Sequence, residues 1–86
     1  MNIVYLPSFV RRLKVLDPDL QEEVLEKIEL LKDVENHKQL KVHKLRGPLA
    51  GRHSFSVNYK TRIIFCYISK KEVALLAIGD HSIYDK

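Results

Sequence analysis

The side chains that could carry out acid–base or phosphate chemistry gather in the second half of the sequence. Histidines occupy four positions along the chain: His37, His43, His53 and His81. No two of them have the His-x-x-x-His spacing that places two metal ligands on one helix face. The sequence also lacks a phosphate-binding glycine loop and a Gly-x-Ser-x-Gly nucleophile motif. We therefore expect no bound metal and no cofactor.

Histidine and arginine together suit the cleavage of RNA without a metal. That reaction needs a base for the 2′-hydroxyl proton, an acid for the departing 5′-oxygen and fixed cations beside the phosphate. Histidine suits the first two roles near neutral pH, and the arginine fork matches phosphate oxygens. Arg52, His53 and Arg62 lie on adjacent predicted strands. His81 follows the last strand and His43 lies on the loop before the first, so we expect these side chains to converge at one end of the sheet.

Each of these side chains also has a purely structural interpretation. Arg52 and Lys60 flank predicted strands, where a charge prevents edge-to-edge pairing. His81 could lie in a surface turn, and Tyr84 could pack the C-terminal tail on the sheet. Arg62 begins an otherwise apolar strand, where its charge must point to solvent or into a site, and we favour the site.

Acidic and basic residues are segregated along the chain, which has a net charge of +4 and a pI near 9.3. Residues 17–35 hold eight acids and two bases, whereas residues 36–71 hold nine bases and no acid. A stretch without carboxylates favours a polyanion such as nucleic acid, and an acidic protein is a compatible second partner. The alternative is a solvated basic face that only keeps the protein in solution.

The periodicity of the first half predicts a strand and two helices. Residues 3–6 form an apolar strand that Pro7 stops, and a short helix starts beside this proline. Asp17 and Pro18 are the N-cap and first residue of a second helix, which we expect to run to about Asn36. The two helices form an antiparallel hairpin with one apolar face, which must cover a sheet.

The second half predicts a loop and then a three-strand meander. The loop spans residues 37–51, and the strands cover residues 52–58, 62–68 and 73–78. We therefore expect one α+β domain over residues 1–86, with the helical hairpin packed on a mainly antiparallel sheet. The basic or titratable side chains expected to contact RNA phosphates are Lys41, Lys44, Arg46, Arg52, His53 and Lys60.

Cysteine content and hydropathy indicate in which cellular compartment the protein is expected. The single cysteine, Cys66, lies in an apolar run, where we expect it to pack rather than react. No apolar run approaches the ~20 residues that span a bilayer, and no secretory signal pattern is present at the N-terminus. We expect a cytoplasmic protein with no membrane partner.

The succession of motifs resembles the RelE/ParE toxin superfamily, in particular its RelE/StbE and YafQ-like members. The resemblance is carried by residues 42–47 (VHKLRG), 51–52 (GR), 62–67 (RIIFCY) and 77–84 (AIGDHSIY), in that order and spacing. The helical hairpin before the basic meander also matches, so that the resemblance spans nearly the whole chain. It implies a RelE-like fold and membership of a type II toxin–antitoxin pair.

The resemblance further implies a ribosome-dependent endoribonuclease, or mRNA interferase. Such a toxin enters the ribosomal A site, cuts the mRNA by 2′-hydroxyl attack and is neutralised by a cognate acidic antitoxin. By position, Arg62 resembles the phosphate-stabilising arginine, and Arg52 resembles the basic residue of the preceding strand. His81 resembles the acid, Tyr84 the aromatic that stacks or assists, and His43 the loop histidine of YafQ-like members.

Two points stay open at the level of the sequence. His43 and His53 are both candidates for the general base. The fold also serves ParE-like proteins that inhibit DNA gyrase by binding, and a toxin relic could bind its antitoxin only to help repress their promoter. Histidines that titrate near neutrality favour the nuclease over the gyrase inhibitor.

Overall fold

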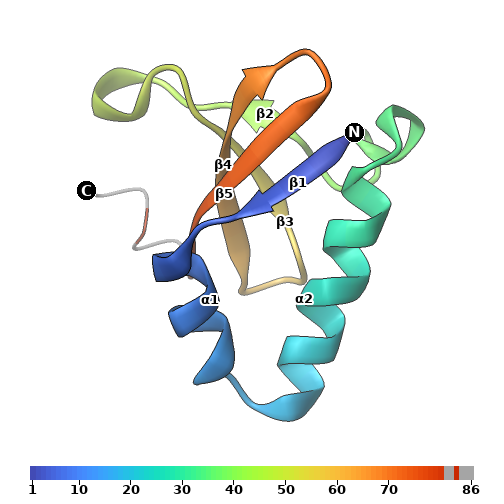
Figure 1. The fold of residues 1–86 in the computed structure, drawn as a ribbon, viewed down its shortest axis with the longest axis vertical. Coiled ribbons are helices and arrows are strands. Elements are labelled where there is room, and N and C mark those ends of the chain that lie inside the picture. Colours follow the sequence, from blue (N-terminus) through green and yellow to red (C-terminus); the bar gives the residue numbers. More distant parts are fainter. Residues whose placement is uncertain (81–82, 84–86) are drawn as a thin grey trace.

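The computed structural model describes residues 1–80 and Ile83, and these form a five-stranded sheet with two α-helices (Figure 1). The elements are, in chain order, β1 (Asn2–Tyr5), α1 (Pro7–Lys14), α2 (Pro18–Leu31), β2 (His43–Lys44), β3 (His53–Ser56), β4 (Arg62–Ser69) and β5 (Glu72–Gly79). Two short 3-10 helices, η1 (Val34–Asn36) and η2 (Gly47–Leu49), lie in the connection from α2 to β3. The predicted α+β class is confirmed.

The sheet is mainly antiparallel, as the sequence predicts. Its strand order is β1-β5-β4-β3-β2, with β1 parallel to β5 and every other pair antiparallel. The meander of β3, β4 and β5 forms its centre, and the first strand of the chain completes one edge. Because β1 and β5 are parallel, the chain needs a crossover between them, and the two helices begin it.

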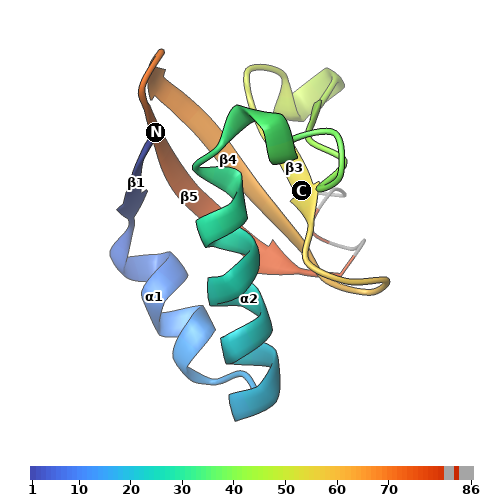
Figure 2. The ribbon, with the colours of Figure 1, turned by 90° about the vertical axis from the view of Figure 1, so that its right-hand side faces the viewer.

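Both helices start at prolines, where the missing N–H has no helical partner to lose. Figure 2 shows them as an antiparallel hairpin. The apolar stripe of α2, made of Val24, Ile28 and Leu31, is fully buried against the sheet. Phe9 of α1 belongs to the same core, and α1 packs beside β5.

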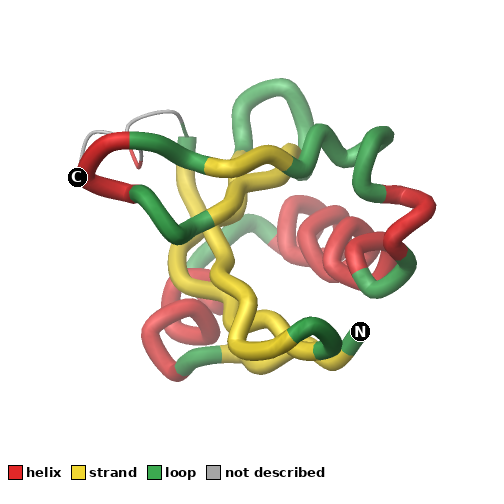
Figure 3. Tube along the Cα trace, turned by 90° about the horizontal axis from the view of Figure 1, so that it is seen from above, coloured by secondary structure: helices red, strands yellow, loops and turns green. Residues whose placement is uncertain are grey.

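The sheet has two faces with different surroundings. The helix face, which packs on α2, consists of Phe55, Ile63, Phe65, Val73, Leu75 and Ile78. The opposite face consists of Arg52, Ser54, Ile64, Cys66, Ala74 and Ala77, since side chains alternate along a strand. Figure 3 shows the segment that contains η2 on the side of the strands away from α2.

The second helix is shorter than predicted. It ends at Leu31, and the chain continues through η1 instead of reaching Asn36 in one helix. Polar side chains cause the break: Asn36 Nδ2 donates to the carbonyl of Leu30, and His37 Nε2 bonds to that of Leu31. The Asp33 carboxylate accepts a hydrogen bond from the Glu35 amide and so starts η1.

The predicted loop over residues 37–51 contains a strand that periodicity missed. β2 pairs His43 with Ser54 and Lys44 with His53, which adds an edge strand beside β3. Two residues are too few to show the alternation that marks a strand, so the sequence pattern does not reveal β2. His43 and Lys44 therefore lie on the sheet and not on a loop.

Candidate functional site

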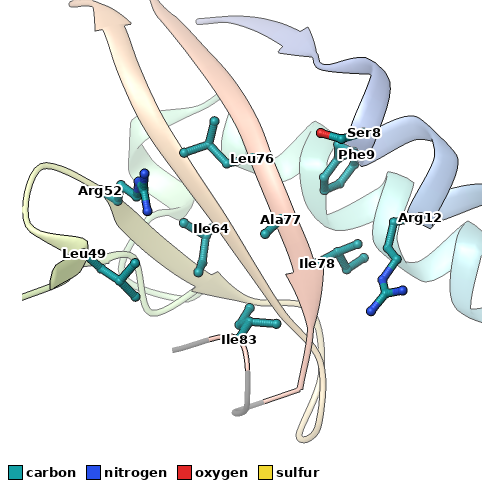
Figure 4. A pocket seen from close by; sticks show the side chains of 10 residues that line it. All are labelled: Ser8, Phe9, Arg12, Leu49, Arg52, Ile64, Leu76, Ala77, Ile78 and Ile83. Carbon is teal, nitrogen blue, oxygen red and sulfur yellow. The ribbon is translucent and has the colours of Figure 1, made fainter. Parts of the chain in front are cut away.

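A pocket of about 500 Å³ lies over the opposite face of the sheet (Figure 4). Ile64 of β4 and Leu76 and Ala77 of β5 form its floor. A β-bulge leaves Leu76 as an extra residue of β5 between the pairs Phe65–Leu75 and Ile64–Ala77, which lets two successive β5 residues line the pocket. The remaining lining residues are Ser8, Phe9, Arg12, Leu49, Arg52, Ile78 and Ile83.

Two arginines from distant parts of the sequence border the pocket. Arg12 comes from α1 and Arg52 from the residue before β3, and Figure 4 shows them on either side of the apolar floor. Both are exposed, and none of the described lining residues is acidic. Two guanidinium groups without a neighbouring carboxylate attract an anion such as phosphate.

His43 lies on the same face as Arg52. Its partner in the β2–β3 pairing is Ser54, so Arg52 is its diagonal neighbour, about 7–8 Å away between Cα atoms. The Nδ1 atom of His43 lies 2.9 Å from the carbonyl oxygen of Lys41. A carbonyl only accepts, so Nδ1 carries the proton and Nε2 is left with the lone pair that a general base needs.

His53 faces the other way and does not join Arg52. Its ring stacks on Phe65 at 5.5 Å and meets Tyr67 edge-on at 4.9 Å, both on the side of the helix face. Burial lowers the pKa of His53 below 6.5, and the charges of Lys44 and His43 lower it further. Its Nδ1 atom is buried without a hydrogen-bond partner in the described part of the chain. The expected convergence of His53 with the arginines is therefore wrong, because adjacent residues of a strand point to opposite faces.

Arg62 is on the face of Arg52 but at the other end of β3. It pairs with Ser56, four residues from Arg52, which corresponds to about 13 Å along the strand. Its Nη1 atom donates to the carbonyls of Asn58 at 2.6 Å and Tyr59 at 3.2 Å in the turn that precedes β4. The sequence led us to expect Arg52 and Arg62 together at one end of the sheet. The structure instead places them at opposite ends of β3.

The other predicted cations are spread along the edge of the sheet. Lys41 precedes β2 with a positive φ of 59°, and Arg46 directly precedes η2. Lys44 pairs with His53, so both side chains point to the same face of the sheet. Lys60 lies in the turn between β3 and β4. All four are exposed.

The predicted acid His81 and aromatic Tyr84 lie outside the described residues. Sequence reasoning also missed Arg12, Leu49 and Ile83 as lining residues of the pocket. Arg12 stands in a run of basic residues on α1, a pattern that by itself is typical of a solvated helix face. Its proximity to Arg52 depends on how α1 packs on β5, which no local pattern encodes.

The described residues offer neither a metal site nor a membrane span. They contain no group of three or more His, Cys, Asp or Glu side chains placed to hold a metal ion. Within the same residues, neither helix has the length and apolar character required to cross a membrane.

No family model and no curated protein matches this sequence. Solved structures do match, among them a RelBE2 toxin–antitoxin complex, a YoeB/ParE toxin, a YoeB–YefM complex and YafQ. The toxin–antitoxin complex RelBE2 from Mycobacterium tuberculosis is 20% identical, with a TM-score of 0.74 over 93% of this chain and 96% of that chain. The YoeB–YefM complex from Staphylococcus aureus is 16% identical, with a TM-score of 0.73 over 94% and 97%. YafQ from E. coli is 16% identical, with a TM-score of 0.70 over 95% and 94%.

These matches agree with the sequence resemblance in one respect, the architecture of the whole domain. The similarity covers 93–95% of this chain and 94–97% of each matched chain, so it includes the strand, the two helices and the C-terminal meander of this protein. The chain therefore has the RelE-like toxin fold.

Proposed function

We propose that this protein is the toxin of a type II toxin–antitoxin system and a metal-independent, ribosome-dependent endoribonuclease that cleaves mRNA. The observation that carries the proposal is the pocket bordered by Arg12 and Arg52, with His43 alongside, on a fold of the RelE type. An apolar floor beneath two guanidinium groups suits a nucleotide, whose sugar or base is apolar on its faces and whose phosphate is anionic.

The reaction that fits these groups is attack by the 2′-oxygen on the adjacent phosphorus. The P–O5′ bond breaks, which leaves a 2′,3′-cyclic phosphate and a free 5′-hydroxyl. Nε2 of His43 takes the 2′-hydroxyl proton, because its Nδ1 is held by the Lys41 carbonyl. Arg52 and Arg12 stabilise the charge that develops on the non-bridging oxygens. An acid must protonate O5′, and His81 stays our prediction for that role.

Arg62 and Tyr84 also belong to the proposal, Arg62 with a changed role, whereas His53 does not. Arg62 contacts a phosphate further along the RNA, since it shares the face of Arg52 about 13 Å away along β3. Tyr84 orients a base or phosphate beside His81. His53 supplies no catalytic group, because it points to the other side of the sheet.

The proposed partner proteins follow from charge. A basic surface is covered most favourably by an acidic segment, and we expect a cognate antitoxin of that kind to cover the pocket. Structures of similar fold are toxin–antitoxin complexes, which supports a partner of this type. The mRNA in the ribosomal A site is the proposed substrate.

Primer extension on mRNA, shortly after induction of the protein in cells, tests the proposal. We expect in-frame cuts within translated regions for the wild type. Arg52→Ala and His43→Gln should each reduce cleavage by about 10²–10³-fold, as does removal of one transition-state donor. Lys70→Ala is the matched control, since it removes an exposed cation from the turn between β4 and β5.

Each other outcome has a definite meaning. Cleavage that survives both variants refutes the assigned site. Intact message with arrested growth and DNA damage signalling indicates a gyrase inhibitor instead. Intact message with normal growth leaves a protein that binds its antitoxin without being toxic.

A further inference from the structure

The turn between β3 and β4 carries an aromatic ring that packs on little of the protein. Tyr59 is 91% exposed, more than any other large apolar or aromatic side chain among the described residues. Figure 2 shows the turn projecting beyond the strands of the sheet. Lys60 follows directly and is exposed as well.

The backbone under Tyr59 is held in place by side chains on both sides of it. The Asn58 side-chain oxygen accepts hydrogen bonds from the amides of Lys60 at 2.9 Å and Thr61 at 2.8 Å. Arg62 Nη1 donates to the carbonyls of Asn58 and Tyr59. A surface group on a fixed backbone loses less conformational entropy on binding than one on a mobile loop.

The same turn is also tied to the helical hairpin. Asn58 Nδ2 donates to the carboxylate of Glu23 in α2 at 2.7 Å, across 35 residues of sequence. This contact anchors the turn to α2. The charged residues next to Tyr59 in the sequence, Lys60 and Arg62, are both cations. No acid occurs anywhere between residues 36 and 71.

An exposed aromatic ring beside cations is the chemistry that recognises unpaired nucleotides. Bases stack on aromatic side chains, and lysine contacts the adjacent phosphate. An acidic protein would use the cations but has no need of the flat ring. The charge and the ring together therefore favour single-stranded nucleic acid.

We propose that the Tyr59 turn, residues 58–61, is a second RNA site, where the Tyr59 ring stacks on an unpaired base and Lys60 binds its phosphate. The inference rests on the proposed function, since it adds to the same RNA a contact outside the pocket. Arg52 precedes one end of β3, and the turn follows the other end. Arg62 pairs with the last residue of β3 and so lies between Arg52 and the turn.

Binding of a labelled single-stranded 2′-O-methyl RNA to the full-length protein tests this site. The methyl group blocks 2′-oxygen attack, so fluorescence anisotropy measures affinity without cleavage. We expect Tyr59→Ser to raise Kd about 5- to 150-fold, the range for loss of one base–aromatic stack. Tyr59→Phe keeps the ring and should bind within about twofold of the wild type. Because Tyr59 is exposed, neither change disturbs the core.

Lysine and duplex controls separate stacking from general charge. Lys60→Ala should weaken binding and reduce the salt slope by about one, whereas Lys70→Ala marks the effect of removing a cation elsewhere. An RNA duplex of equal length has no unpaired base, so Tyr59→Ser should leave its binding unchanged.

Three results would overturn the site. These are equal Kd values for wild type and Tyr59→Ser, an equal loss on the duplex, or a loss of antitoxin binding with RNA binding intact, which would assign the turn to a protein partner. Failure of the proposed function looks different. If RNA binding depends on Tyr59 but mRNA is not cleaved, the Tyr59 site stands and the nuclease proposal is refuted. If mRNA is cleaved but RNA binding does not depend on Tyr59, the nuclease proposal stands and the Tyr59 site is refuted.

Discussion

Replacement of His53 by phenylalanine should stabilise the protein, although it removes a candidate general base. The buried Nδ1 atom of His53 lacks a hydrogen-bond partner among the described residues. An unsatisfied buried polar group costs about 1–3 kcal/mol, and we take the lower end because the His53 side chain is only partly buried. A phenyl ring can keep the aromatic contacts with Phe65 and Tyr67. His53→Phe should therefore gain about 1 kcal/mol and raise Tm by about 4–8 °C in a domain of this size.

The pH dependence of that gain has a definite sign. The pKa of His53 in the folded protein lies below 6.5, because burial disfavours the charged ring. As the pH falls below 6.5, the unfolded chain takes up this proton before the folded protein does. Above pH 6.5 His53 is neutral in both states, and the protein has its full free energy of unfolding. This free energy falls as the pH drops towards the lowered pKa of His53. The advantage of His53→Phe should therefore grow between neutral and acidic pH.

Thermal unfolding followed by circular dichroism at several pH values, beside message cleavage in cells, measures both consequences. The His53→Phe protein should melt higher and, under our proposal that His43 is the base, cleave mRNA like the wild type. A lower Tm would refute the packing argument, and loss of cleavage with intact folding would reassign the base to His53.

Three further predictions concern the scaffold, each measured by urea unfolding. Ile28→Ala should cost about 2–5 kcal/mol because Ile28 is fully buried under the sheet, and a cost below about 1 kcal/mol would contradict its place in the core. Asn58→Ala should cost about 1–3 kcal/mol, since it breaks the bond to Glu23 and the turn bonds, and an unchanged midpoint would show that the turn forms without them. Gly51→Ala should cost about 1–3 kcal/mol, although space is open there, because its φ of +89° strains any residue with a Cβ, and a neutral result would mean that the turn relaxes.

The sequence by itself determined the elements whose residues alternate or repeat. The apolar stripe of α2 and the assignment of Phe55 and Ser54 to opposite faces follow from helix and strand geometry, although Ser54 is polar and fully buried all the same. Strand alternation also separates Arg52 from His53, although only the position of α2 shows which face of the sheet forms the core.

Short-range competition between side chains and backbone was harder to foresee. The end of α2 is set by Asn36 and His37, which bond to carbonyls that a longer helix would use itself. β2 is detectable only through its partner strand, since two residues show no period. The end of α2 thus depends on local hydrogen bonds, whereas β2 depends on its pairing with β3.

The composition of the pocket was a matter for the tertiary structure alone. The basic stretch of the sequence marks a polyanion surface, but it omits Arg12, which α1 brings to the pocket from 40 residues before Arg52. The register of β3 and β4 keeps Arg62 at a distance from Arg52 and near the turn carbonyls. Residue types and periods are local properties and follow from the order of amino acids, whereas strand register and helix packing depend on how distant segments bury their apolar faces together.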